Sequence, residues 1–464
     1  MKIKDKFYVL FALVSFLLAL FSLNFYQGSK IVYLIYSITA IIFFIYLTNS
    51  KSFFVENFLA LYFYLGYWFS FSIKISFFDS NFVGFSDGFG NFDFSQNSFD
   101  EVLIICIWSF LSIIFASYIR RKFCTYDICS YNKLKDFSIY KLREDILSLF
   151  IFFFALIICF VNSFYSIFQR GTLPNLNVNF FLSNSYKWFL TFGYMTLFCF
   201  FINYFQQFKT NSFSKIQLYI YYICELLVHI SILSRGLIFN GLSILWGLKK
   251  QVYKISSKKF IIPIILLIFL FILNIFIVGD LRTKQITQDF DSKSKAQIEK
   301  KISDNRNFFN KLSVVLVSRL HGFEAIMAVQ GHKDKSFKFF LSALKKNTGP
   351  NEISFFDKIK SDDRQNTYRN VSLTLPGLIA FLFYSGSISF IILCLMALVI
   401  LLAIFEKLIF HLTKGNIVFL SFVGHMIAYR LWHFGHNPSN TYLFILSIFL
   451  SCFFIIFLKK LFIK

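Results

Sequence analysis

The sequence predicts an all-α polytopic membrane protein with about 12 transmembrane helices and one large extramembrane segment late in the chain. Two observations lead to this fold class. Hydrophobic residues make up 57% of the 464 residues, and the mean hydropathy is +0.63, which is more apolar surface than a soluble core could bury. Apolar stretches long enough to cross a hydrocarbon layer of roughly 30 Å, which takes about 20 helical residues, also recur from end to end.

Twelve apolar ranges are expected to form the spans. In chain order they are Phe7–Phe25, Ile31–Leu47, Phe53–Ile73, Val102–Ile119, Ile146–Ile167, Trp188–Phe205, Ile216–Leu233, Leu237–Leu248, Phe260–Val278, Ile388–Phe405, Ile417–Leu431 and Tyr442–Leu458. The first has lysines before it, as a signal peptide would. Because its apolar part is long and no small-residue cleavage site follows, we interpret it as a retained span.

Short basic connections predict the orientation of these spans. Lysine and arginine gather at the N-terminus, at 120–143, at 209–215, at 249–259, at 407–414 and in the C-terminal tail. The connections between these basic ones carry very few, and the segment Asp79–Asp100 has four aspartates and no lysine or arginine. Both termini are therefore expected in the cytoplasm, in agreement with the even number of spans.

The apolar run Ile216–Leu248 has Ser234-Arg235-Gly236 near its middle and lysines on both sides. Its 33 residues are too many for one crossing and too few for two. A single crossing would place the lysines at 249–259 outside, so we predict a tight helical hairpin whose turn lies below the outer surface. A guanidinium at a bilayer centre costs at least about 2.5–3.5 kcal/mol, and an anionic substrate is one candidate for compensating it.

The predicted spans divide the chain into three parts. Residues 1–279 hold the first nine spans, residues 280–370 form a large outer loop, and residues 371–464 hold a re-entrant or outer segment followed by the last three spans. The loop carries 18 Lys and Arg against 11 Asp and Glu, and it is long enough to escape the charge rule for short loops. Within it, Phe308–Val329 is apolar enough to form a helix packed on the membrane or dipped into it.

An outward cavity lined by arginines and covered by a basic loop suits a lipid-anchored anion. A guanidinium stays charged and offers phosphate a planar fork of donors. The arginines expected to contribute are Arg235, Arg282, Arg319, Arg364 and Arg369. Two alternatives stay open: Arg282 can be an interfacial residue whose head reaches toward water, and Arg364 and Arg369 can belong to a solvated surface.

Two groups of histidines are candidates for polar chemistry. If Phe308–Val329 is helical, His321 and Glu324 share a face and could orient a general base for a sugar hydroxyl, while Arg319 points roughly the other way. The alternative for that pair is a structural hydrogen bond. His433 and His436, at the outer end of the eleventh span, suit contacts to pyrophosphate or sugar, with an interfacial aromatic belt as the alternative.

Neither a cofactor nor a nucleic-acid partner is expected. The histidines near the eleventh span, His425 included, have no accompanying carboxylate or cysteine, so no metal site is predicted. The sequence contains no P-loop, no glycine-rich dinucleotide signature and no aspartate-rich sugar-nucleotide motif. These absences argue against nucleotide-sugar donors and against the use of ATP.

Two local patterns accompany the span layout: Ser234-Arg235-Gly236 in a hairpin, and Leu375-Pro376-Gly377 followed by Phe383-Tyr384-Ser385-Gly386-Ser387. With about twelve spans and one large late outer loop, the chain resembles the Wzy-type O-antigen or oligosaccharide repeat-unit polymerases. Ser385 and Ser387 stand where that family more often has a Phe-Gly-like pattern.

This resemblance implies a GT-C-like glycosyltransferase architecture in the cell inner (plasma) membrane. The implied reaction is inverting glycosyl transfer at the periplasmic face, which builds O-antigen or capsular polysaccharide. A growing glycan on undecaprenyl pyrophosphate is the donor, and one lipid-linked repeat unit is the acceptor. The resemblance implies no metal, and a chain-length regulator protein is a candidate partner besides the lipid bilayer.

The residues that would carry the implied reaction are those already singled out. Arg235, Arg319, His321 and Glu324 are the candidate catalytic residues, and Arg282, Arg364, Arg369, Tyr384, His433 and His436 are the candidate substrate-binding residues. On this interpretation the arginines stabilise the departing pyrophosphate as the glycosidic bond breaks.

Two other functions compete with the polymerase. An O-antigen ligase resembles these polymerases in topology, but ligases usually carry a His-Asn motif within the large loop, whereas His436-Asn437 follows it here. A lipid-linked oligosaccharide flippase or other transporter also fits twelve spans. Transporters, however, tend to have two related halves and helices interrupted within the membrane, and this chain has one lopsided outer segment.

Overall fold

Every element of the structure, a computed structural model, is helical within the residues that it describes. Those residues are 3–49, 53–78, 89–125, 144–169, 179–208, 215–234, 236–251, 258–288, 320, 322–345, 355–360, 375–435 and 438–462. Packing divides the chain into two compact units. Unit 1 comprises Met1–Thr125, Arg306–Glu406 and Met426–Thr441, and unit 2 comprises Tyr126–Asn305, Lys407–His425 and Tyr442–Lys464.

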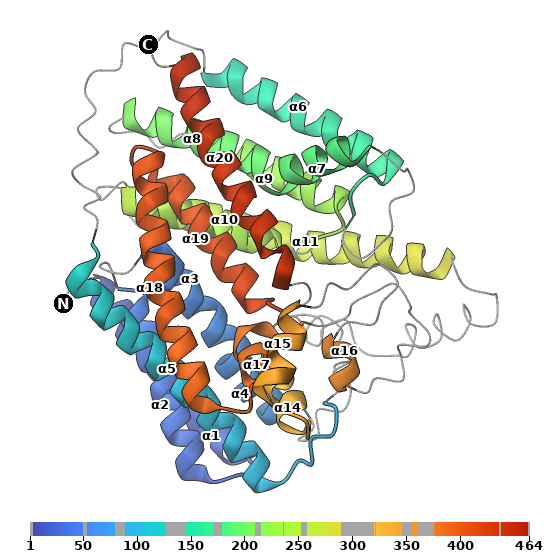
Figure 1. The fold of residues 1–464 in the computed structure, drawn as a ribbon. Helices are drawn as coiled ribbons and strands as arrows, with labels where there is room; N and C mark the ends of the chain where they lie inside the picture. Colours follow the sequence, from blue (N-terminus) through green and yellow to red (C-terminus); the bar gives the residue numbers. More distant parts are fainter. Residues whose placement is uncertain are drawn as a thin grey trace. The chain divides into compact units, whose positions relative to one another are not determined.

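The helices of the first 288 residues follow the predicted spans closely (Figure 1). They are α1 (Ile3–Leu23), α2 (Lys30–Leu47), α3 (Phe54–Phe63), the π-helical η1 (Tyr64–Phe69), α4 (Ser70–Phe77), α5 (Gln96–Phe123), α6 (Glu144–Tyr165), α7 (Phe180–Trp188), the π-helical η3 (Phe189–Gly193), α8 (Tyr194–Phe208), α9 (Lys215–Ser231), α10 (Leu237–Gln251) and α11 (Lys258–Gln288).

The helices of the later part include several short ones. They are α14 (Phe323–Gln330), α15 (Phe337–Lys345), α16 (Phe355–Lys360), α17 (Gly377–Phe383), α18 (Ile388–Leu412), α19 (Ile417–Trp432), the 3₁₀-helical η5 (Pro438–Asn440) and α20 (Thr441–Phe462). A helix thus occupies each of the twelve ranges predicted as spans. Two of these ranges, α3–α4 and α7–α8, each contain a π-helical segment, a feature often found at functional sites.

Six helices in the described part of the chain are long and apolar enough to cross a membrane: α2, the continuous helix Phe54–Phe77, α5, α11, α18 and α20. Several of them expose large apolar side chains, as lipid-facing helices do. Leu393 and Leu401 on α18 and Leu446 and Phe453 on α20 are each at least 60% exposed. Exposed apolar faces of this extent are typical of a helical membrane protein.

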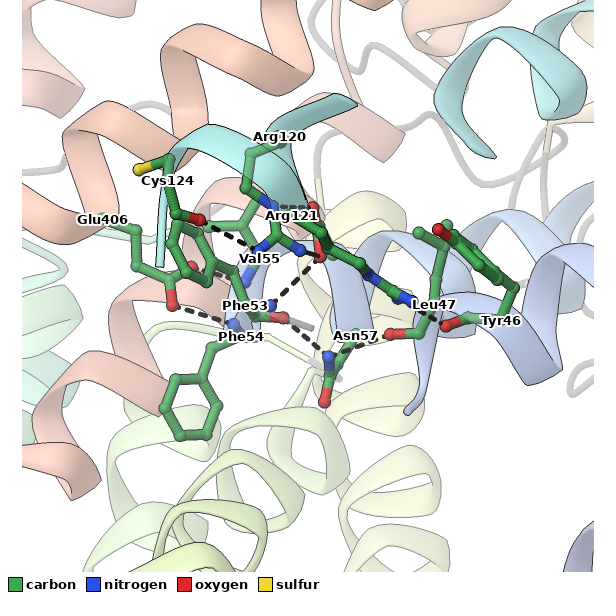
Figure 2. Close-up of polar contacts among 11 residues, drawn as sticks. Tyr46, Leu47, Phe53, Phe54, Val55, Asn57, Arg120, Arg121, Cys124 and Glu406 are labelled. Atoms are coloured by element: carbon green, nitrogen blue, oxygen red, sulfur yellow. Dashed lines mark hydrogen bonds and ion pairs between the residues drawn. The ribbon is translucent and has the colours of Figure 1, made fainter. Parts of the chain in front are cut away.

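A buried polar cluster joins four helix ends of unit 1 (Figure 2). The Arg120 guanidinium at the end of α5 donates to both Glu56 oxygens in the first turn of α3, at 2.8 and 2.5 Å. The carboxylate of Glu406 on α18 accepts the backbone N–H groups of Phe54 and Val55 at 2.8 Å each. An anion at a helix N-terminus satisfies donors that have no intrahelical partner, which explains why α3 begins here.

The end of α2 is tied into the same cluster. Asn57 donates to the Leu47 carbonyl at 3.0 Å, and Arg121 donates to the Tyr46 carbonyl at 2.8 Å (Figure 2). The ends of α2 and α5, the start of α3 and Glu406 near the end of α18 therefore lie together. The alternation of spans predicted from the short basic connections requires this grouping.

The short helix α14 runs from the interior of unit 1 to the start of α5. Its first residue, Phe323, stacks on Phe71 with ring centroids 3.8 Å apart, and its last residue, Gln330, donates to the Glu101 carboxylate at 2.9 Å. The ammonium group of Lys335 donates to the Gln330 carbonyl, and burial lowers the pKa of that lysine. Within the loop 280–370, α14 and Lys335 are thus packed in unit 1, whereas residues 280–288 continue α11 in unit 2.

The short helix α17 also begins inside unit 1, next to Tyr67. Its first residue, Gly377, has φ of +74°, and a Cβ there would lie 2.8 Å from the Trp432 carbonyl oxygen and 3.0 Å from the Tyr67 hydroxyl. Gly322, which precedes α14, has φ of +150°, and a Cβ there would lie 3.0 Å from the Tyr67 ring. Glycine is required at both positions next to Tyr67, because a side chain there would collide with its neighbours and would strain a backbone with positive φ.

Candidate functional site

The apolar run Ile216–Leu248 forms two helices, α9 and α10, joined by a short turn, as the sequence predicted. Residue 235 lies outside the described residues. On its N-terminal side the Ser234 N–H donates to the His229 carbonyl at 2.8 Å, and on its C-terminal side Phe239 N–H donates to the Gly236 carbonyl at 3.2 Å. The helices have 17 and 15 residues, which correspond to about 25 and about 22 Å at 1.5 Å per residue.

Two buried asparagines from neighbouring helices hold this turn. The amide of Asn162 on α6 donates to the carbonyl and the hydroxyl oxygen of Ser231 at 3.0 Å each, and its own oxygen accepts from the Phe168 N–H at 2.9 Å. The amide of Asn274 on α11 donates to the Ser234 carbonyl at 2.9 Å. Carbonyls at the end of a helix have no intrahelical donor, so these amides both satisfy them and fix the turn.

A carboxylate lies fully buried between the two helices of the hairpin. Glu225 on α9 is 0% exposed, and its carboxylate accepts from three side chains of unit 2. One carboxylate oxygen accepts from the imidazole of His229, at 2.7 Å, and from the amide of Asn240 on α10. The other oxygen accepts from the phenol of Tyr194 on α8. In turn, His425 on α19 donates to the Asn240 oxygen at 2.8 Å.

These contacts indicate which atoms of the network donate and which accept. Because the Asn240 oxygen accepts from His425, the Asn240 nitrogen faces Glu225 as a donor. The Asn240 nitrogen also lies 3.2 Å from His229 Nε2. An ionised Glu225 can only accept, and opposite it a neutral His229 carries its proton on Nε2 and its lone pair on Nδ1. The Nδ1 atom has no hydrogen-bond partner among the residues that the structure describes. The ring lies beside the turn, because a Cβ on Gly236 would be 3.8 Å from His229 Cε1.

The sequence interpretation missed this network, although its residues lie in the run it singled out. It treated Ile216–Leu248 as apolar apart from Arg235, yet Glu225, His229 and Asn240 are all within it. A usable signal was present, since glutamate and histidine four residues apart share a helix face. A carboxylate within a span is also a functional-site candidate by itself.

Glu324, a predicted catalytic residue, forms a buried ion pair in unit 1. Its carboxylate contacts the Lys74 ammonium group of α4, and the two side chains are 4% and 0% exposed. The predicted continuous helix over Phe308–Val329 is wrong in one respect, because α14 begins only at Phe323. Gly322, with φ of +150°, is not helical, so the continuous helix on which the predicted pairing of Glu324 with residue 321 depended is absent at that point.

Three predicted substrate-binding residues are also described. Tyr384, at the end of α17, is buried against the rings of Phe339 and Phe381 at 5.4 and 5.2 Å. His433 packs against Tyr429 in unit 1, with ring centroids 4.4 Å apart and the planes tilted by 39°. Arg282 is half-buried on α11, which continues past the predicted end of the ninth span to Gln288.

Six predicted site residues lie outside the described residues. They are Arg235, Arg319, His321, Arg364, Arg369 and His436. Glu324, Tyr384 and His433 belong to unit 1, whereas Arg282 belongs to unit 2, as does the Glu225 network. Both units contain buried carboxylates among their described residues, and that of unit 2, Glu225, lies one helical turn from His229 beside the hairpin turn.

Within the described residues, no group of three or more His, Cys, Asp or Glu side chains is placed to hold a metal ion. Comparisons with known proteins found no matching family model, no similar curated protein and no similar solved structure.

Proposed function

We propose that this protein polymerises oligosaccharide repeat units carried on undecaprenyl pyrophosphate, by inverting glycosyl transfer at the periplasmic face of the inner membrane. The observation that carries the proposal is the α9–α10 hairpin. Its turn contains Arg235 in the sequence, is held by buried amides, and lies beside a glutamate–histidine pair. A cation and a candidate proton acceptor are the two groups that this transfer needs at one place.

The dimensions of the hairpin support this assignment. Helices of about 25 and about 22 Å are shorter than a hydrocarbon layer of roughly 30 Å. Lysines flank both ends of the hairpin, so both ends belong on the cytoplasmic side and the turn points outward. The turn then lies within the outer leaflet, at the depth where the pyrophosphate of a lipid-linked glycan meets its first sugar.

Charge supplies the second line of support. A guanidinium binds phosphate through two parallel donors and remains charged in an apolar setting. The outer segment 280–370 is basic, and Arg282, Arg319, Arg364 and Arg369 are its candidate contacts to the donor and acceptor lipids. In this proposal the twelve helical ranges are spans, both termini are cytoplasmic, and no nucleotide is consumed because the lipid pyrophosphate is the leaving group.

Substitution of Arg235 tests the proposal. In cells that make the glycan, Arg235→Ala is expected to reduce the polymer ladder to a single capped repeat unit while the protein level stays unchanged. The matched control is Lys249→Ala, which removes a cation from the other end of the same hairpin and should leave the ladder intact. A full ladder in the Arg235→Ala strain would overturn the assignment. A topology reporter fused near Ser256 should give a cytoplasmic signal.

One observation favours a second candidate, a flippase for lipid-linked oligosaccharide. Both α14 and α17 begin inside unit 1, next to Tyr67, and interrupted helices are common in transporters. Gene deletion separates the candidates. Repeat units trapped in the cytoplasmic leaflet indicate a flippase, lipid-linked polymer without attachment indicates a ligase, and single capped units indicate a polymerase.

A further inference from the structure

We propose that His229 is the general base of the transfer and that Glu225 positions it. This inference rests on the proposed polymerase function and names a residue that removes the proton from the acceptor sugar. The proposed function needs a proton acceptor beside the turn, but it assigns that role to neither side chain.

The first step is the orientation of the histidine ring. His229 Nε2 donates to the Glu225 carboxylate at 2.7 Å, one helical turn away on α9. A carboxylate in this position fixes both the tautomer and the plane of the ring. It also stabilises the imidazolium that forms when the other nitrogen takes up a proton.

The second step is the assignment of roles within the pair. Glu225 is fully buried, and each of its oxygens already accepts from a side chain: Tyr194 on one, and Asn240 and His229 on the other. His229 Nδ1, by contrast, has no hydrogen-bond partner among the described residues, and it is buried. His229 is therefore the proton acceptor and Glu225 is a positioning residue.

The third step is the location of the ring. His229 Cε1, which lies between the two ring nitrogens, would be 3.8 Å from a Cβ on Gly236. The His229 carbonyl accepts from the Ser234 N–H at 2.8 Å. The base thus adjoins both residues that flank Arg235. A donor pyrophosphate bound at this turn, as the proposed function has it, would bring the anomeric carbon of the donor sugar into the same region.

The other titratable groups that face the pair come from three neighbouring helices. They are Tyr194 on α8, the thiol of Cys159 on α6 and His425 on α19, while α10 and α11 present the neutral amides of Asn240 and Asn274. Besides His229, the hydrogen-bonding partners of Glu225 are the phenol of Tyr194 and the amide of Asn240, and neither is a cation. His229 is consequently the group in this network that can exchange a proton without losing the carboxylate's contacts.

The reaction step balances without another reactant. The acceptor hydroxyl gives its proton to His229 Nδ1 as its oxygen forms a bond to the anomeric carbon of the donor. On the opposite face, the bond from that carbon to the pyrophosphate oxygen breaks, and its electron pair leaves with the lipid pyrophosphate, whose charge Arg235 stabilises. The configuration inverts, and the imidazolium later releases its proton to water.

The test uses the full-length protein in proteoliposomes, with the lipid pyrophosphate-linked repeat unit as both donor and acceptor. Removal of a general base lowers rates by about 10²–10⁴-fold. We expect His229→Ala to lower kcat in that range with KM within about threefold of wild type, and added imidazole to restore part of the rate. Glu225→Gln should give a smaller loss and should shift the pH dependence of kcat. The matched control, His411→Ala on α18, should leave kcat unchanged.

The outcomes distinguish this inference from the proposed function. If His229→Ala keeps a kcat near that of wild type while Arg235→Ala abolishes polymerisation, the general base is wrong and the polymerase stands. If wild-type protein forms no polymer, both fail. Should His229→Ala not fold, Glu225→Gln decides, because an unchanged pH profile in that isosteric variant excludes a glutamate-oriented base.

Discussion

The two units bury their carboxylates in different ways. In unit 1, Glu56 is paired with Arg120 and Glu324 is paired with Lys74, so two of its buried carboxylates contact a cation, while Glu406 accepts backbone N–H groups at the start of α3. In unit 2, Glu225 accepts from a phenol, an amide and an imidazole. A neutralised pair mainly fixes the helices that carry it, whereas a carboxylate surrounded by neutral donors can orient a titratable neighbour. We therefore expect stability to dominate the effects in unit 1 and activity to dominate those in unit 2.

The largest loss of stability is expected for Glu56→Gln. It leaves the buried Arg120 guanidinium without its anion, and removing one partner of a buried ion pair costs about 3–5 kcal/mol. The measurement is the thermal unfolding of detergent-solubilised protein. As a control, Glu56→Gln combined with Arg120→Met should recover part of the loss because the uncompensated charge is gone. A single variant as stable as wild type would contradict the structural role of the pair.

A somewhat smaller loss, about 3 kcal/mol, is expected for Lys74→Met. The remaining carboxyl of Glu324 is then buried alone, but it can be neutralised by binding a proton. If Lys74 and Glu324 only stabilise unit 1, the polymerisation activity of purified Lys74→Met should fall in proportion to its folded fraction. If the variant is fully stable yet inactive, Glu324 belongs to the chemistry, as the sequence interpretation supposed, and the contrast between the units fails.

The sequence predicted the helices well because they depend on local apolar patterning. Each of the twelve expected ranges is helical, and Gly236 marks the break between α9 and α10. The partners of the buried charges were not predictable in this way, because Lys74 and Glu324 are 250 residues apart in the chain. Glu225 was overlooked for a different reason: one carboxylate hardly alters the average hydropathy of a 33-residue run. Gly322 interrupts the expected helix through its backbone angle, which composition does not reveal.

In unit 2, Asn162→Leu is expected to affect activity more than stability. The amide holds the hairpin turn through Ser231, and its loss leaves carbonyls at the end of α9 without a donor, at a cost of about 1–3 kcal/mol. Because the turn carries the candidate site, polymer formation should fall well beyond the loss of folded protein. The control is Ser185→Ala, which removes an exposed hydroxyl on α7 of the same unit. Parallel losses in stability and activity would show that the asparagine has no role beyond folding.

The smallest effect is expected for Ser421→Ala, also in unit 2. The Ser421 hydroxyl donates to the Ser243 carbonyl at 2.6 Å where α19 passes α10, and a neutral hydrogen bond of this kind contributes about 0.5–1.5 kcal/mol. The two helices approach closely there, since a Cβ on Gly247 would lie 3.0 Å from Val418 Cα. Alanine preserves that approach, so thermal unfolding isolates the hydrogen bond. A loss as large as that of Glu56→Gln would mean that neutral contacts hold unit 2 as firmly as ion pairs hold unit 1. The difference between the units would then no longer support a separate chemical role for Glu225.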